Sequence, residues 1–445
     1  MKYFVFLLLI SCTVFSQKHS KDEEVKKYVS QVSEDSLKSY IGKLVSFETR
    51  HTLSTLDDPK YGIGAARNWV IKKFNEYAKN SGGRMEVYLQ QEDLQPDGKR
   101  IDKAVNLGNA VAFLKGTDPD DKRIFLIGGH LDSRVTDVMN RTSKAPGAND
   151  DGSGVSAVIE SARILSRSSF PASIIFVAFS GEEQSLLGSK QLAEKIKREN
   201  LQLEAVLNND MIGNSKAGET GEVNTGVLRV FSEGLPYKDL DKKAMTIRNL
   251  GFENDSESRQ LARYIKEITE QYIKGLEIKL IYRNDRFLRG GDHTSFVNNG
   301  FPSVRLTEYY ENYDHQHQDI RVENNKQYGD LPEFIDFKYL KKNVAANIAV
   351  LASLAKSTSK PEKVEMDVKE LTNSTTLHWE KPKSGTPAGY YVLARETDSP
   401  VWQKKIFTKE LSIKVPLSKD NYIFAVQTIS QSGNLNVPVI PGIAK

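Results

Sequence analysis

Short, wholly apolar runs are the feature of this sequence that most constrains its fold. Residues 123–130 ("RIFLIGGH") and 173–180 ("SIIFVAFS") show no alternation of polar and apolar side chains, and further strands are predicted at 203–213 and 301–308. Such runs are typical of strands that are buried on both faces of a sheet. Because amphipathic helical patterns separate them, the sequence predicts an α/β fold, with a mainly parallel central sheet sandwiched by helices.

The segments on either side of this central region, which we place at 101–356, have different patterns of polar and apolar residues. Residues 17–100 are predicted to be a helical N-terminal segment that packs on the central domain or forms part of it. Residues 357–365 are polar and contain proline, as in a linker. Beyond them, short alternating strands predict a small β-sandwich over 366–445. Its Trp379 and Tyr422 resemble the core aromatics of a fibronectin type III module.

The first 16 residues indicate export. Lys2 precedes an apolar stretch too short to span a membrane, followed by small residues, so we predict a signal peptide over 1–16. Lipidation at Cys12, which would anchor the chain to a membrane, is the alternative. Cys12 is the only cysteine, so any metal site must be built from His, Asp and Glu. The net charge of +4, without a basic stripe, gives no indication of a nucleic-acid partner.

Acidic residues and histidines follow the ends of successive predicted strands. They are His130 and Asp132, Asp150 and Asp151, Glu182 and Glu183, Asp210, and finally His315 and His317. A parallel sheet brings the carboxyl ends of its strands to one edge, so these groups should converge there. Carboxylates packed together repel one another unless a cation neutralises them. A donor set of histidine and carboxylate suits Zn²⁺, with Mn²⁺ or Co²⁺ possible.

The ordered set "GGHLDS", "PGANDDGSG", "SGEEQSLLGS", "NNDMIG" and "QH" closely resembles the co-catalytic di-zinc aminopeptidases of zinc metallopeptidase family 28. The resemblance covers roughly residues 100–350 and implies the fold of zinc-dependent exopeptidases, with two Zn²⁺ ions per chain. It further implies that Asp150 bridges the two metals. One metal would be completed by His130 and Asp210, and the other by Glu183 and His317.

The resemblance also assigns the neighbouring residues. Glu182 would act as general base on a metal-bridging hydroxide, and Asp132 would hold the His130 imidazole by a hydrogen bond. Asp151 looks like a helix cap. For the late ligand, His315 remains the alternative to His317.

Other residues near these motifs have less specific expected roles. Tyr309, Tyr310 or Tyr313 could donate to the developing oxyanion. Asp292 and His293 could support the metal site or only shape a loop. The remaining histidines, His19, His51 and His378, are expected at the surface or in packing.

The leading functional hypothesis is an exported aminopeptidase that removes N-terminal residues from peptides with a free N-terminus. Carboxypeptidases and single-zinc glutaminyl cyclases share the scaffold, and Arg283, Arg286 and Arg289 could bind a substrate's terminal carboxylate. A non-catalytic protein that presents its C-terminal module to a surface or polymer is the rival class. The complete ligand set together with Glu182 favours the enzyme, and the C-terminal module could still bind a surface or polymer beside the catalysis.

Overall fold

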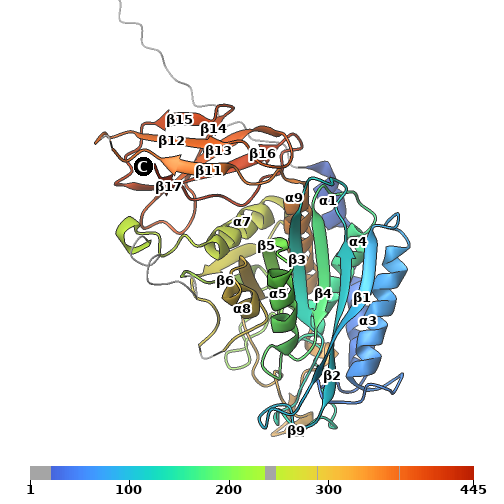
Figure 1. Cartoon of the computed structure of the whole chain (residues 1–445). Coiled ribbons are helices and arrows are strands. Elements are labelled where there is room, and N and C mark those ends of the chain that lie inside the picture. The colour runs from blue at the N-terminus through green and yellow to red at the C-terminus, as the bar shows by residue number, and fades with distance from the viewer. Residues whose placement is uncertain (1–21, 236–246, 288, 370, 445) are drawn as a thin grey trace, which may run out of the picture.

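The computed structural model describes residues 22–235, 247–287, 289–369 and 371–444, so the predicted signal peptide and Cys12 lie outside the described residues. An eight-stranded sheet forms the centre of the molecule, in the order β1-β2-β4-β3-β5-β8-β6-β7 (Figure 1). Its strands are β1 (Met85–Leu94), β2 (Val105–Leu114), β3 (Arg123–His130), β4 (Ser173–Phe179), β5 (Gln202–Asn209), β6 (Val227–Ser232), β7 (Glu277–Ile281) and β8 (Ser303–Glu308).

The sheet is mixed, with a parallel centre. Strands β4, β3, β5 and β8 run parallel to one another, whereas β1 and β2 add to one side antiparallel and β6 pairs antiparallel with β8. The predicted α/β class is therefore confirmed. The central strands are the apolar runs, and they are buried on both faces because helices cover both.

Helices flank the sheet on its two faces (Figure 1). They are α1 (Glu23–Ser30), α2 (Glu34–Val45), α3 (Gly62–Ala78), α4 (Gly152–Leu165), α5 (Leu187–Arg198), α7 (Glu257–Tyr272), α8 (His293–Asn298) and α9 (Phe337–Lys356). Alternate side chains of β3 point to opposite faces: Phe125 and Ile127 join the core beneath α4 and α9, whereas Ile124 and Leu126 join the core beneath α5 and α8. No helix in the described ranges is long and apolar enough to cross a membrane.

The N-terminal helices belong to the same core as the sheet. Val25 and Tyr28 of α1 and Leu37 and Leu44 of α2 are buried in the cluster that contains α4 and α9. Burying one such side chain contributes about 1.5–3 kcal/mol. Residues 22–100 are thus built into the main domain of the fold.

The C-terminal region forms two small sheets, with the strand orders β15-β12-β11-β17 and β14-β13-β16. Their strands are β11 (Glu362–Met366), β12 (Thr375–Glu380), β13 (Pro387–Glu396), β14 (Lys404–Thr408), β15 (Ser412–Val415), β16 (Tyr422–Ser430) and β17 (Gly442–Ile443). Trp379 is buried between the two sheets, where it packs against Tyr390. The likeness to a fibronectin type III module stays a prediction.

These C-terminal sheets share their core with the main domain. Tyr391 and Leu393 of β13 face the opposite way from Tyr390 and join the main cluster. The second sheet is therefore covered on both faces, which explains why its strands contain continuous apolar runs. The segment 357–365, predicted as a linker, is buried at 357–359 and enters β11 at Glu362.

Buried ion pairs reinforce this junction. The Asp255 carboxylate, just before α7, accepts hydrogen bonds from Arg263 Nη1 (3.0 Å) and from Arg395 Nη2 of β13 (2.6 Å). All three side chains are nearly inaccessible to solvent. At the start of β3, Arg123 donates to the carbonyl groups of Ser357 and Thr358.

Removing the shared carboxylate should therefore destabilise the whole chain. We expect Asp255→Ala to lower the free energy of unfolding by about 3–5 kcal/mol, because two buried guanidinium groups lose their counter-charge. Urea denaturation followed by circular dichroism measures the effect. The matched control is Asp420→Ala, which removes an exposed aspartate of the C-terminal sheets' region. Equal denaturation midpoints for the two variants would contradict this account of the junction.

Candidate functional site

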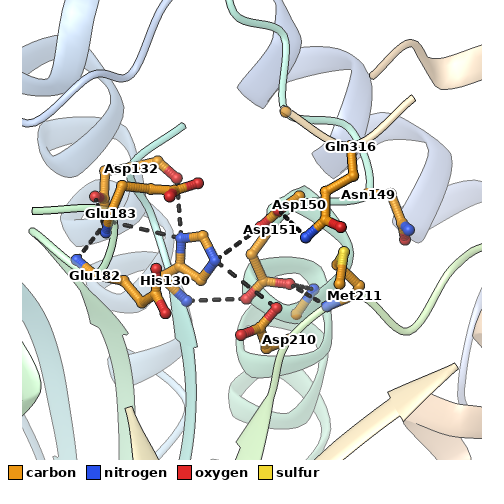
Figure 2. A network of polar contacts seen from close by, with 12 residues as sticks. His130, Asp132, Asn149, Asp150, Asp151, Glu182, Glu183, Asp210, Met211 and Gln316 are labelled. Carbon is orange, nitrogen blue, oxygen red and sulfur yellow. Dashed lines mark hydrogen bonds and ion pairs between the residues drawn. The ribbon is translucent and has the colours of Figure 1, made fainter. Parts of the chain in front are cut away.

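The predicted site residues lie together at the carboxyl ends of three neighbouring strands, β4, β3 and β5. His130 is the last residue of β3, and Asp210 directly follows β5. Glu182 and Glu183 lie in the turn after β4, and Asp150 lies just before α4. Figure 2 shows the His130 imidazole between Asp132 and the two glutamates on one side and the aspartates on the other.

Two groups of potential metal ligands share Asp150. The first contains His130, Asp150 and Asp210, and the second contains Asp150, Glu183 and His317. Within each group, the ligand atoms lie within 4.8 Å of one another. Asp150 Oδ1 is 3.0 Å from His130 Nε2, while Asp150 Oδ2 is 3.0 Å from His317 Nε2. One carboxylate thus presents an oxygen to each group, which is the arrangement expected of a bridging ligand.

The His130 ring is held with Nε2 facing the site. Its Nδ1 lies 3.0 Å from the backbone carbonyl of Asp132, and a proton on Nδ1 donated to that oxygen leaves Nε2 as an acceptor. The Asp132 carboxylate is farther away, at 3.7 Å from Nδ1. The imidazole therefore donates its hydrogen bond to the main-chain carbonyl of Asp132 and not, as expected, to the Asp132 side chain.

The Asp132 carboxylate instead organises the glutamate turn. It accepts hydrogen bonds from the backbone N–H of Glu182 (3.2 Å) and of Glu183 (3.0 Å), and from Thr52 Oγ1 (2.9 Å). It is fully buried. This contact fixes the position of both glutamates relative to His130.

Asp151 is the helix cap that the sequence predicted. Its side chain accepts from the N–H of Gly154 (2.9 Å) in the first turn of α4. The same carboxylate accepts from the N–H of His130 (2.9 Å) and of Met211 (3.1 Å), so it ties α4 to the ends of β3 and β5. The peptide bond between Asp150 and Asp151 is cis. Asp151 belongs to neither ligand group among the described residues.

His317 is the late histidine that faces the ligands. Its Nε2 lies 2.9 Å from Glu183 Oε1, yet this buried oxygen accepts no hydrogen bond. Burial alone would lower the pKa of His317, but Glu183 and Asp150 raise it to about 9, so the cluster favours positive charge at this ring. The donor types, the shared aspartate and the unsatisfied Oε1 all fit a divalent cation.

His315 has a different environment. Its ring stacks on Phe334, with centroids 3.6 Å apart, and it joins neither ligand group among the described residues. It is half-buried, and that burial lowers its pKa. Of the two candidates, His317 is thus the one whose geometry suits a ligand.

Glu182 lies beside the two groups but is not a member of either. It lines the same cavity of about 470 Å³ as His130, Asp150 and Glu183. Burial raises the pKa of Glu182 well above its usual value, and the nearby carboxylates of Glu183 and Asp210 add to the increase. A carboxyl group with a raised pKa, next to a metal site, is suited to accepting and releasing a proton.

The tyrosines proposed as oxyanion donors lie outside this cavity in the described structure. Tyr310 Oη donates to Glu222, Tyr309 packs edge-on against Tyr310, and Tyr313 is exposed in the adjoining groove. Gln316 does line the cavity, and its Nε2 donates to Asp150 Oδ2 (3.1 Å).

The other predicted histidines and Asp292 are placed as follows. His293 is buried, with Nε2 2.9 Å from the carbonyl of Asn284, and neither it nor Asp292 belongs to a ligand group in the described ranges. His51 is buried, and its Nε2 is hydrogen-bonded to the backbone carbonyl of Val138 (2.8 Å). His378 pairs with Glu365 on the C-terminal sheets, and His19 lies outside the described residues.

Two buried arginines support the ligands without having been predicted from the sequence. Arg305 of β8 places Nη2 3.0 Å from Asp210 Oδ1, and its Nη1 is 3.3 Å from Asp285. Arg50 donates to the carbonyls of Leu131 and Gly147, near the two ends of the loop that connects β3 to α4. The only sequence signal for Arg305 is a charged residue within the predicted strand 301–308.

Asp330 is the third unpredicted support. Its two carboxylate oxygens accept from the backbone N–H of Asn149 (2.8 Å) and of Asp150 (2.7 Å), and it is buried. It reaches the site from a loop 180 residues farther along the chain than Asp150. No local pattern in the sequence marks this long-range contact.

Comparison with known proteins identifies relatives over nearly the whole chain. The model of "Peptidase family M28" matches residues 109–331. A probable zinc metalloprotease of Leptosphaeria maculans is 42% identical over 421 residues, which cover 94% of this chain and 97% of the relative. A second probable zinc metalloprotease, from Pyricularia oryzae, is 40% identical over 94% of this chain and 84% of the relative.

Solved structures share the fold at low sequence identity. The LapA aminopeptidase of Legionella pneumophila aligns with a TM-score of 0.53 at 19% identity, over 76% of each chain. An aminopeptidase from Aneurinibacillus sp. strain AM-1 aligns with a TM-score of 0.50 at 15% identity, over 74% of this chain and 96% of its own. These similarities describe the architecture, a mixed sheet flanked by helices.

The two candidate histidines should differ in their effect on metal content. We expect His317→Ala to lower the amount of zinc that copurifies with the protein, because the variant loses a ligand of the second group. His315→Ala should retain wild-type zinc, since its ring faces Phe334. Elemental analysis of the two purified variants decides between them, and zinc loss confined to His315→Ala would contradict the assignment.

Asp330 should affect zinc affinity through the backbone of Asp150. We expect Asp330→Ala to weaken zinc binding about 10–100-fold, the range found for residues that orient metal ligands. Competition with a chromophoric chelator measures this affinity. Asp319→Ala is the matched control. It also removes an aspartate, but in the described part of the chain the Asp319 side chain makes no hydrogen bond. Equal affinities in the two variants would show that Asp330 does not position Asp150.

Proposed function

The chain belongs to peptidase family M28, and its relatives include probable zinc metalloproteases; on this basis we propose that it is a di-zinc aminopeptidase that removes N-terminal residues from peptides. The observation that carries the proposal is Asp150, shared by two ligand groups, with Glu182 beside both and a member of neither. A site of this kind offers positions for two metal ions and one carboxylate, that of Glu182, which is not needed as a ligand.

In the proposed reaction, His130 and Asp210 would hold one zinc ion, Glu183 and His317 would hold the other, and Asp150 would be a ligand common to both groups. When bound, such ions polarise the scissile carbonyl and lower the pKa of a water molecule. Glu182 accepts a proton from the attacking water and passes it to the nitrogen of the leaving amine. Its raised pKa supports both halves of this transfer.

Neighbouring side chains hold the ligands and Glu182 in position. Asp132 fixes the turn that carries Glu182, and Asp151 fixes the end of the strand that carries His130. Gln316 Nε2, already close to Asp150, supplies a donor near the reacting carbonyl, in place of the tyrosine expected there.

Aminopeptidase activity is favoured over the alternatives on two grounds. Two of the structural neighbours are aminopeptidases by name, and a pair of ligand groups suits two metals better than the single zinc of a glutaminyl cyclase. Carboxypeptidase activity is the second candidate, because Arg286 and Arg289 line the same cavity as the ligands. Export through residues 1–16, with peptides outside the cytoplasm as substrates, completes the proposal.

The decisive experiment is hydrolysis of aminoacyl-nitroanilides, each compared with its N-acetylated counterpart and with N-blocked dipeptides that have a free C-terminus. We expect cleavage only where the α-amine is free. We expect Glu182→Gln to lower kcat by about 10²–10⁴ while zinc content stays at the wild-type level, because the variant loses the proton acceptor and keeps every ligand.

The matched control is Glu194→Gln, an exposed glutamate of α5, which should retain full activity. Cleavage confined to N-blocked dipeptides would replace the aminopeptidase by a carboxypeptidase. Zinc-loaded protein that cleaves none of the substrates would refute the peptidase proposal, and cyclisation of N-terminal glutamine would then be tested.

A further inference from the structure

The cavity that contains the ligand groups is also lined by four arginines, Arg100, Arg134, Arg286 and Arg289. The acidic residues in its lining are the three ligand carboxylates and Glu182. Leu186 is the one large aliphatic side chain among the described lining residues. A pocket for an apolar substrate side chain would be lined mainly by apolar residues. The four arginines therefore indicate a different kind of ligand.

Two of these arginines are fixed by backbone carbonyl groups. Arg100 Nη1 donates to the carbonyl of Glu183 (2.6 Å), and Arg134 donates to the carbonyls of Val135 (3.1 Å) and Thr136 (3.2 Å). A carbonyl oxygen orients a guanidinium group but does not neutralise it. The nearest carboxylate oxygen recorded for Arg134 is Glu183 Oε2, at 3.9 Å.

The other two arginines come from the loop that follows β7. Arg286 is paired, since its Nη1 lies 2.6 Å from Glu311 Oε2 and its Nε lies 3.4 Å from Asp285. Arg289 is exposed, and the described structure gives its side chain no ion pair. Both also line an adjoining groove of about 660 Å³, so they lie where the cavity opens into the groove.

The charges of the loaded site do not cancel these arginines. When ionised, the four cavity carboxylates have a total charge equal in size and opposite in sign to that of two divalent cations, so metal binding leaves no carboxylate charge to balance Arg100, Arg134 and Arg289. A partly enclosed surface with unneutralised guanidinium groups binds carboxylates well, because the planar fork can donate two parallel hydrogen bonds. A substrate carboxylate is the anion that a peptide can bring there.

We propose that these arginines bind a carboxylate of the peptide substrate close to the scissile bond, so that the enzyme favours acidic substrates over neutral ones. The carboxylate is either the side chain of an N-terminal Asp or Glu or the C-terminus of a dipeptide. Arg289 is the principal contact, because it is the arginine of the set that is both exposed and without an ion pair in the described structure. This inference rests on the proposed peptidase function.

The test compares two isosteric pairs of substrates. Leu-Ala against Leu-Ala-amide probes the C-terminal carboxylate, and Glu-nitroanilide against Gln-nitroanilide probes the side chain. We expect kcat/KM to be about tenfold higher for the acid in at least one pair, mainly through KM, and to lose this preference in Arg289→Gln. Arg289→Lys should restore part of it, and high salt should weaken it in the wild type.

Arg198→Gln, an exposed arginine at the end of α5, is the control that should keep the wild-type ratios. Calorimetric binding of the same pairs to zinc-loaded Glu182→Gln protein tests carboxylate recognition without turnover. Acid-to-amide ratios near one in both pairs and both assays would overturn the inference while leaving the peptidase function standing. Absence of hydrolysis of every substrate, with the acids still bound more tightly, would instead refute the peptidase function alone.

Discussion

The three hydrogen bonds accepted by the Asp151 carboxylate are the contact on which the site depends. They come from the backbone N–H groups of His130, Gly154 and Met211, which belong to the end of β3, the start of α4 and the segment after β5. Each hydrogen bond of this kind contributes about 0.5–1.5 kcal/mol, and more where the acceptor is charged. Because two ligand strands and the ligand loop meet at one carboxylate, a small shift there would move His130, Asp150 and Asp210 together.

Around this centre, buried charges from other parts of the chain hold the aspartate ligands and the loop that leads to Asp150. Arg305 on β8 contacts Asp210, Asp330 holds the backbone of Asp150, and Arg50 contacts both ends of the loop between β3 and α4. Leaving any of these groups unpaired in the interior would cost several kcal/mol. The ligand geometry and the stability of the main domain are therefore coupled, and precise placement is obtained from rigid elements and not from the loops alone.

The C-terminal sheets take part in the same structure at a distance from the ligands. Their core is continuous with that of the main domain, and their contacts include the beginning of β3, at the opposite end of the strand from His130 (Figure 1). Tyr282, which follows β7, donates to the carbonyl of Pro400 and so connects these sheets to the loop that carries Arg286 and Arg289. The C-terminal region thus contacts the segment that leads to two residues of the cavity lining, in addition to sharing the core of the main domain.

The sequence by itself determined the fold class, the helix cap at Asp151 and the set of side chains that could bind metal, because apolar runs, capping chemistry and strand-end motifs are local signals. It did not determine the antiparallel strands β2, β6 and β7, the burial of residues 357–359, or the support from Arg305 and Asp330. Those depend on pairings between residues as many as 235 positions apart. Only the tertiary structure distinguished His317 from His315, since the choice rests on which ring faces Glu183 and which stacks on Phe334.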